Sequence, residues 1–167
     1  MNALKTWMQS AAAGIVLVVA ITGVARAEPQ EKQIRLAPSD IAAMATSGPG
    51  AGTSGVAGIE TTVLSGDPTA AGPYTIALRV PAHTRIAAHT HRDDRAAVVV
   101  SGMWFFGYGS RADDAKLKAL GPGSFYTEPA DAPHFAMTRD KAATVYITGF
   151  GPTDTHYIDA TTDPRQP

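Results

Sequence analysis

The hydrophobic positions of this chain form short segments that turn-forming residues separate, without sustained helical periodicity in its central part. Between residues 74 and 80, for example, Ile76, Leu78 and Val80 alternate with Thr75, Ala77 and Arg79, which places the three aliphatic side chains on one face of a strand. Glycine and proline follow many of the segments and favour turns. This spacing predicts an all-β sandwich or barrel. The predicted strands are 59–64, 74–80, 86–91, 96–100, 104–108, 117–120, 124–127, 134–137, 143–150 and 155–158.

The first part of the chain has a different pattern. Lys5 precedes an apolar run from Ala11 to Val24, and Ala25-Arg26-Ala27 fits a small-x-small cleavage site. The run is short for a helix that spans a membrane, and charged residues follow it directly. We therefore predict that residues 1–27 are a signal peptide cleaved after Ala27. The remaining chain would be periplasmic or secreted, with no membrane partner after signal removal.

The rest of the chain is predicted to form one domain with an N-terminal arm and a short tail. Pro38-Ser39-Asp40 is a suitable start for one short helix, and residues 47–58 are rich in glycine and small side chains, which favours a flexible surface loop. We place the arm at 28–58, the β-barrel at 59–160 and a frayed tail at 161–167.

Composition excludes several classes of function. The net charge is −1 with no basic tract, so nothing indicates nucleic-acid binding. The chain contains no cysteine, so it forms no disulfide and offers no thiolate as a metal ligand or nucleophile.

Two histidines stand out, because His89 and His91 are two residues apart in front of the apolar run 96–100. On a strand such a pair points to the same face. The segments His83 to Gly102 and Gly123 to Thr138 together resemble the two sequence motifs of the cupin superfamily. The matching positions of the two motifs are His89, His91, Gly102, Gly123, Pro129 and His134.

The resemblance covers most of the chain after the predicted signal peptide and is closest to small single-domain cupins, many of which carry signal peptides. It implies a jelly-roll barrel, or double-stranded β-helix, with a short N-terminal helix. Alternate residues of a small antiparallel barrel face its interior, so His89, His91 and His134 are expected to converge there. Imidazole is a common ligand of divalent metals, and this set suits iron, manganese, zinc, nickel or copper without selecting one.

The cupin pattern is not fully kept. Arg95 stands where the family usually has a glutamate ligand, and a guanidinium cannot bind a metal because it is protonated and has no free lone pair. Arg95 could pair with Asp93, Asp94 or Glu128, or bind an anionic substrate through two hydrogen bonds. We expect Asp93 and Asp94 to be solvated in the turn after the histidine pair.

Four other positions require separate predictions. His83 replaces the first motif glycine and is a weak candidate for a fourth ligand, because the intervening sequence is expected to turn. His156 is predicted to be a surface residue of an edge strand. Asp131 replaces a glycine at a turn that favours positive φ, and Thr138 replaces an asparagine.

These residues suggest a metal-dependent enzyme that acts on a small molecule, with dioxygenase-like or isomerase- and lyase-like chemistry as the two options. The catalytic candidates are Glu128, as acid, base or substitute ligand, and Arg95, as a group that orients an anionic substrate. An exposed Glu128 at a strand end is an equally good interpretation. The alternatives are a non-catalytic cupin that binds or senses a small molecule or metal, and a structural homodimer with an unused pocket. A homodimer is expected in each case.

Overall fold

The computed structural model describes residues 33–50 and 52–166, so the predicted signal peptide and its cleavage site lie outside the described residues. The described chain has a one-turn helix, α1 (Pro38–Ala42), followed by strands β1 to β10. None of its helices has the length and apolar character needed to cross a membrane. Each predicted strand overlaps an observed one, so the strand prediction is confirmed.

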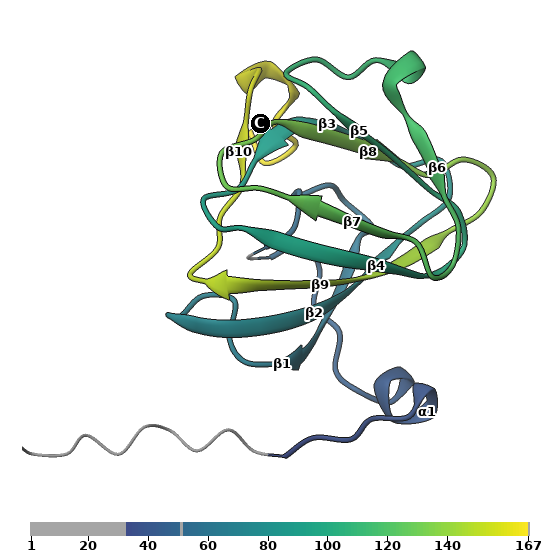
Figure 1. Cartoon of the computed structure of the whole chain (residues 1–167), viewed down its shortest axis with the longest axis vertical. Helices are drawn as coiled ribbons and strands as arrows, with labels where there is room; N and C mark the ends of the chain where they lie inside the picture. The colour runs from purple at the N-terminus through teal and green to yellow at the C-terminus, as the bar shows by residue number, and fades with distance from the viewer. Residues whose placement is uncertain (1–32, 51, 167) are drawn as a thin grey trace, which may run out of the picture. The chain divides into compact units, whose positions relative to one another are not determined.

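The strands form two antiparallel sheets that face each other (Figure 1). The first sheet has the order β1 (Glu60–Ser65), β2 (Gly72–Val80), β9 (Ala143–Gly151), β4 (Arg95–Ser101) and β7 (Phe125–Glu128). The second has the order β10 (His156–Tyr157), β3 (Arg85–Thr90), β8 (His134–Met137), β5 (Trp104–Tyr108) and β6 (Lys118–Leu120). Sequence neighbours are often separated within the sheets, as in the jelly-roll type of sandwich.

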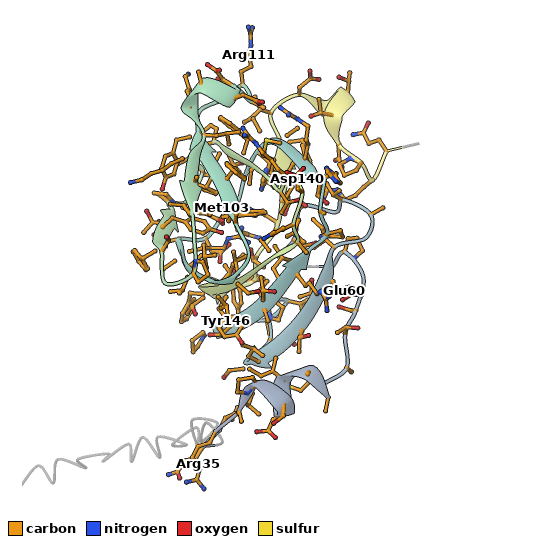
Figure 2. All side chains as sticks on the ribbon, turned by 90° about the vertical axis from the view of Figure 1, so that its right-hand side faces the viewer. Arg35, Glu60, Met103, Arg111, Asp140 and Tyr146 are labelled. Carbon is orange, nitrogen blue, oxygen red and sulfur yellow. The ribbon has the colours of Figure 1, made fainter. Side chains whose placement is uncertain are left out.

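The core lies between the sheets and follows the alternation in the sequence. Ile76, Leu78 and Val80 are all buried, which confirms that they share the inner face of β2. On β9 the inner face carries Val145, which is 0% exposed, whereas the next residue, Tyr146, points away from the core (Figure 2). The sandwich therefore has one apolar interior, and its inward positions are set by the period of two along each strand.

The expected barrel is not closed. Among residues 33–50 and 52–166, no ladder of backbone hydrogen bonds joins the two sheets, so β1 and β7 remain edges of one sheet and β10 and β6 edges of the other. The edge strands of the second sheet are short: β6 has three residues and β10 has two. Such short strands form few ladder hydrogen bonds. Because the two sheets are not joined, the architecture is an open sandwich with the jelly-roll strand order.

The glycine-rich segment 47–58 differs from the predicted flexible surface loop. Ser47 forms a bridge with Thr61 of β1, and Thr53 and Ser54 are buried. The glycines allow this path, since Gly55 has a φ of 79° and a side chain there would lie 2.8 Å from Cγ of Arg165. Residues 47–50 are exposed, as a surface loop would be, whereas Gly52, Thr53 and Ser54 are buried.

Candidate metal centre

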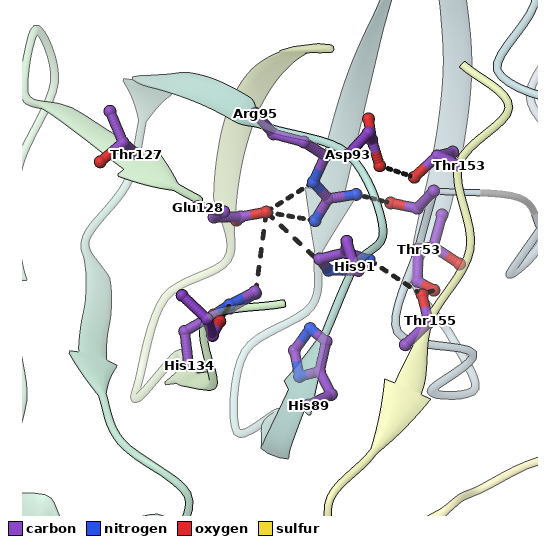
Figure 3. Close-up of polar contacts among 12 residues, drawn as sticks. Thr53, His89, His91, Asp93, Arg95, Thr127, Glu128, His134, Thr153 and Thr155 are labelled. Carbon is purple, nitrogen blue, oxygen red and sulfur yellow. Dashed lines mark hydrogen bonds and ion pairs between the residues drawn. The ribbon is translucent and has the colours of Figure 1, made fainter. Parts of the chain in front are cut away.

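Three histidines converge at one end of the sandwich interior (Figure 3). His89 on β3 and His134 on β8 are paired residues in the antiparallel register of these strands, and His91 follows directly after β3. All three side chains are buried, and one nitrogen of each lies within 4.8 Å of the others. The structure thus brings together the three predicted ligands.

The hydrogen bonds of the imidazole rings fix their orientation. In each ring Nδ1 faces a backbone carbonyl oxygen, which can only accept, so Nδ1 carries the proton and Nε2 keeps a free lone pair. Nε2 of His91 and of His134 is buried without any hydrogen-bond partner. The Nδ1 contacts are His89 to Ala87 (2.8 Å), His91 to Asp154 (2.5 Å) and His134 to Ala132 (3.1 Å).

Burial also keeps the three rings neutral. Burial, together with the positive charge that His134 would carry if protonated, lowers the pKa of His89 to about 3. Burial likewise lowers the pKa of His91 and of His134. Neutral imidazoles with inward lone pairs are the form in which histidine binds a metal, so the donor set fits a divalent ion.

Arg95 and Glu128 form a buried ion pair beside the histidines. They are direct cross-strand neighbours in the β4–β7 register, which explains why the sequence places them together. Nε of Arg95 donates to Oε2 of Glu128 at 2.6 Å, and Nη2 donates to the same oxygen. This oxygen also lies 3.8 Å from Nε2 of His91 and 3.7 Å from Nε2 of His134. Of the partners considered for Arg95, the structure selects Glu128.

The guanidinium keeps this carboxyl group ionised. Burial is the largest influence and would raise the pKa of Glu128, but the charge of Arg95, its hydrogen bonds and smaller contributions from the neighbouring histidines together outweigh burial, and the pKa is lowered. Burial opposes the charge of Arg95 too, yet Glu128 raises the pKa of this guanidinium. Glu128 is therefore a carboxylate that faces the histidines, not the exposed strand-end residue of the other interpretation.

The two aspartates after the histidine pair have different surroundings. Asp93 is 8% exposed, so the prediction that it is solvated is wrong. It accepts hydrogen bonds from the hydroxyl of Tyr74 at 2.8 Å and from that of Thr153 at 2.6 Å. Asp94 is exposed as predicted and accepts from the backbone N–H of Ala130. Asp93 is an even number of residues from His91 and Arg95, so the alternation of buried and exposed residues continues through this turn.

The remaining candidates lie outside the cluster or support its frame. His83 is not part of the histidine group and lies in a turn with a φ of 59°, which removes it as a fourth ligand. His156 is exposed, as predicted. Asp131 has the expected positive φ, at 58°. Thr138 is buried and donates to the carbonyl of Pro81 at 2.5 Å, so it connects two turns.

Residues Gly52 to Ser54 close this end of the sandwich, a role that sequence reasoning missed. Their three carbonyl oxygens each accept a hydrogen bond from a side chain of a different residue, which holds the backbone over the site. The pairs are Arg95 Nη1 to Gly52 (2.8 Å), Thr155 Oγ1 to Thr53 (2.7 Å) and Tyr157 Oη to Ser54 (2.6 Å). We call residues 52–54 the closing segment.

A small cavity lies between the closing segment and the histidines. Its volume is about 20 Å³, which is enough for an ion or one water molecule. His89, His134, Arg95 and Glu128 line its polar side. In the described conformation the site is therefore suited to an ion, and a larger ligand requires movement of its walls.

Comparison with known proteins shows similarity in structure only. No protein-family model and no curated protein sequence matches the chain. The polyketide cyclase RemF from Streptomyces resistomycificus aligns at 18% identity and a TM-score of 0.60, over 80% of this chain and 90% of that one. An RmlC-like cupin from Shewanella frigidimarina NCIMB 400 aligns at 14% identity and a TM-score of 0.53, over 72% of this chain and 93% of the other.

A third similar structure is larger. The DMSP lyase DddQ from Ruegeria pomeroyi DSS-3 aligns at 18% identity and a TM-score of 0.51, over 65% of this chain but only 54% of the lyase. Sequence identities at this level establish a shared fold and no shared activity. The sandwich, its strand order and these structural neighbours together show that the chain has the cupin fold.

Proposed function

We propose that this protein is an exported, metal-dependent enzyme that acts on a small molecule through a divalent ion bound by His89, His91 and His134. The observation that carries the proposal is the convergence of three buried, neutral imidazoles, each with one ring nitrogen within 4.8 Å of the others. Nε2 of His91 and of His134 has no hydrogen-bond partner. Buried polar atoms without a partner are uncommon and require an explanation, which a bound ion supplies. Iron, manganese, zinc, nickel and copper all fit nitrogen donors.

The residues around the ion favour proton transfer as the chemistry. When bound, a divalent ion would act as a Lewis acid toward a substrate oxygen. Glu128 is ionised and its Oε2 faces two of the histidines, so it is placed to accept a proton. Arg95 holds this carboxylate in place through two hydrogen bonds. Isomerase- or lyase-like chemistry is thus our first choice and dioxygenase-like chemistry the second.

Two further properties belong to the proposal. Export rests on the signal-like pattern of residues 1–27. A homodimer rests on the free sheet edges and on large exposed apolar side chains, such as Phe125 on the edge strand β7 and Phe150 at the end of the central strand β9.

The alternative is a non-catalytic protein that binds or senses a metal or small molecule. One observation favours it: Arg95 occupies the position of the usual acidic ligand and binds Glu128 through two nitrogens, which keeps that carboxylate occupied. Metal binding without turnover of any substrate would support this function.

Elemental analysis of the protein, purified without a histidine tag, tests the metal site. We expect about one equivalent of a first-row divalent metal per chain. The double variant His89→Ala/His134→Ala should lose it. The matched control His83→Ala/His156→Ala removes two histidines outside the cluster and should retain the metal. Absence of metal after loading with each candidate ion, or equal metal in both variants, would contradict the proposal.

A further inference from the structure

Three buried side chains carry polar atoms that the proposed metal site does not use. Nε1 of Trp104, the hydroxyl of Tyr126 and Oγ of Ser54 have no hydrogen-bond partner, although their residues are only 2%, 6% and 4% exposed. All three residues line the same cavity as His89 and His134. Unsatisfied groups in a dry interior are costly, so their position on a cavity wall indicates a ligand.

The two aromatic groups are hydrogen-bond donors. The indole N–H of Trp104 can only donate. Burial raises the pKa of Tyr126 well above its usual value, and the charge of Glu128 adds to this. Arg95 and the nearby indole N–H of Trp104 offset the rise only in part, so the phenol keeps its proton. The histidines, in contrast, present lone pairs to the cavity. The cavity is therefore lined by acceptors that suit a metal ion and by donors that suit an oxygen atom.

An apolar wall connects these two polar groups. The ring of Phe106 lies 4.2 Å from that of Tyr126 and 5.4 Å from that of His134, measured between centroids. Leu78, Ile86 and Ile147 also line the cavity. A ligand that reaches both the donors of Trp104 and Tyr126 and the histidines thus has a short, uncharged middle part.

The charges beside the cavity indicate the charge of this ligand. Arg95 and Glu128 line the cavity and contribute one positive and one negative formal charge. Asp93 does not line it but is buried two residues before Arg95 in the sequence and contributes a second negative charge. Their sum is −1, so a divalent ion would leave +1. A buried net charge is unfavourable, and one anionic oxygen on the ligand would neutralise it.

We propose that Trp104 and Tyr126 are substrate-binding residues that donate hydrogen bonds to an oxygen of a small monoanion, whose other oxygen lies toward the histidines. This inference rests on the proposed function for the position of the ion, and it adds the substrate class: a compact carboxylate or enolate with a second acceptor oxygen. Entry requires the closing segment to move, because the cavity holds about 20 Å³. A single buried water bound to the same donors is the competing explanation.

The indole N–H of Trp104 supplies a direct readout. The chain has two tryptophans, Trp7 and Trp104, so in a Trp7→Phe background the indole region of a ¹H–¹⁵N correlation spectrum reports Trp104 alone. The zinc-loaded full chain is titrated with pyruvate and, separately, with isobutyrate. These probes have the same charge and similar size, but only pyruvate has a keto oxygen that can accept from the donors.

We expect pyruvate to shift the indole resonance and to bind about ten-fold more tightly than isobutyrate, as one neutral hydrogen bond allows. Tyr126→Phe should remove most of this preference without changing the zinc content. Tyr146→Phe is the matched control, because Tyr146 points outward from the first sheet (Figure 2), and it should leave the preference intact. Equal affinity for both probes, or a preference that survives Tyr126→Phe, would overturn the inference and assign the donors to water.

The zinc content separates this inference from the proposed function. Loss of zinc binding with a retained pyruvate preference would contradict the metal site and leave the donor pair supported. Normal zinc binding without any effect of pyruvate on the indole resonance would contradict the donor pair and leave the metal site supported. If the protein neither binds zinc nor prefers pyruvate, both the metal site and the donor pair are overturned.

Discussion

The same strands build both ends of the sandwich interior, but one end is filled with aliphatic side chains and the other with charged and polar ones. On β4, Arg95 and Val99 point to the same inner face and are both buried, at 5% and 0% exposed. Val99 pairs with Val145 across the sheet, whereas Arg95 pairs with Glu128. One strand thus contributes to an apolar core at one end and to a charged site at the other.

The difference shows what each end requires. Aliphatic side chains need only to exclude water and fill space. The polar end needs a partner for every buried charge, and it has one for Arg95, Glu128 and Asp93. Several atoms there have no partner, and all of them belong to residues of the histidine cluster or the cavity wall. They are Nε2 of His91 and of His134, Nε1 of Trp104, the hydroxyl of Tyr126 and Oγ of Ser54. These unsatisfied polar atoms lower the free energy of unfolding, whereas the aliphatic side chains at the apolar end contain no such atoms.

Acid should affect the polar end first and most strongly. The pKa of each cluster histidine is lowered on folding, so the unfolded chain binds more protons below about pH 6.5. Stability is then fully present above that pH and falls as the pH decreases toward the folded values, about 3 for His89. The slope approaches about 1.4 kcal/mol per pH unit for each histidine, or about 4 kcal/mol for the three. Urea unfolding of the metal-free protein at several pH values between 7.5 and 5.5 measures this slope of the free energy of unfolding against pH.

Two variants assign this slope to the cluster. His89→Gln/His134→Gln should flatten the pH dependence, because glutamine does not titrate. His83→Gln/His156→Gln removes histidines outside the cluster and should leave it unchanged. Equal slopes in both variants would show that the acid sensitivity arises elsewhere. A saturating divalent ion should reduce the loss, since protons and metal compete for the same Nε2 atoms.

Arg95→Met should give the next largest effect. It leaves Glu128 buried without its main partner, and breaking a buried ion pair from one side costs about 3–5 kcal/mol. The double variant Arg95→Met/Glu128→Gln should recover a large part of this loss, because no charge is then left unpaired. Denaturant unfolding at pH 7.5 measures all three proteins. A double variant as unstable as Arg95→Met would show that Arg95 acts mainly through its bond to the closing segment.

Val99→Ala is the matched variant at the apolar end of the same strand. Removal of two buried carbon atoms costs about 2 kcal/mol. Metal content and affinity should stay unchanged, whereas Arg95→Met should alter metal affinity because it frees the carboxylate beside the histidines. A change of metal affinity in Val99→Ala would show that the two ends are coupled.

The sequence predicted the parts of this molecule that follow local rules. The period of two located the strands and the inner face of β2, and the His-x-His spacing with His134 located the cluster. It left open whether Arg95 pairs with Glu128, because that depends on the register of β4 with β7. Register depends on long-range pairing and is not encoded in the spacing of either strand.

The closing segment and the partners of Asp93 could not be predicted for a related reason. Glycine and small residues are compatible with a mobile loop and with a tightly bound one, and only the partners decide. Those partners, Thr155 and Tyr157, lie about a hundred positions later in the chain. Asp93 is turned inward by Tyr74 and Thr153, which come from two other parts of the sequence.

Tyr157→Phe should give the smallest effect and tests how the polar end is closed. The substitution removes the hydroxyl that donates to the carbonyl of Ser54 but keeps the ring beside His89. One neutral hydrogen bond contributes about 1 kcal/mol, so the closing segment should open about five-fold more often. Amide hydrogen exchange should therefore speed up about five-fold near residues 52–55 and stay unchanged in β9. Tyr146→Phe is the control, and equal exchange rates in the two variants would mean that Arg95 and Thr155 hold the segment without Tyr157.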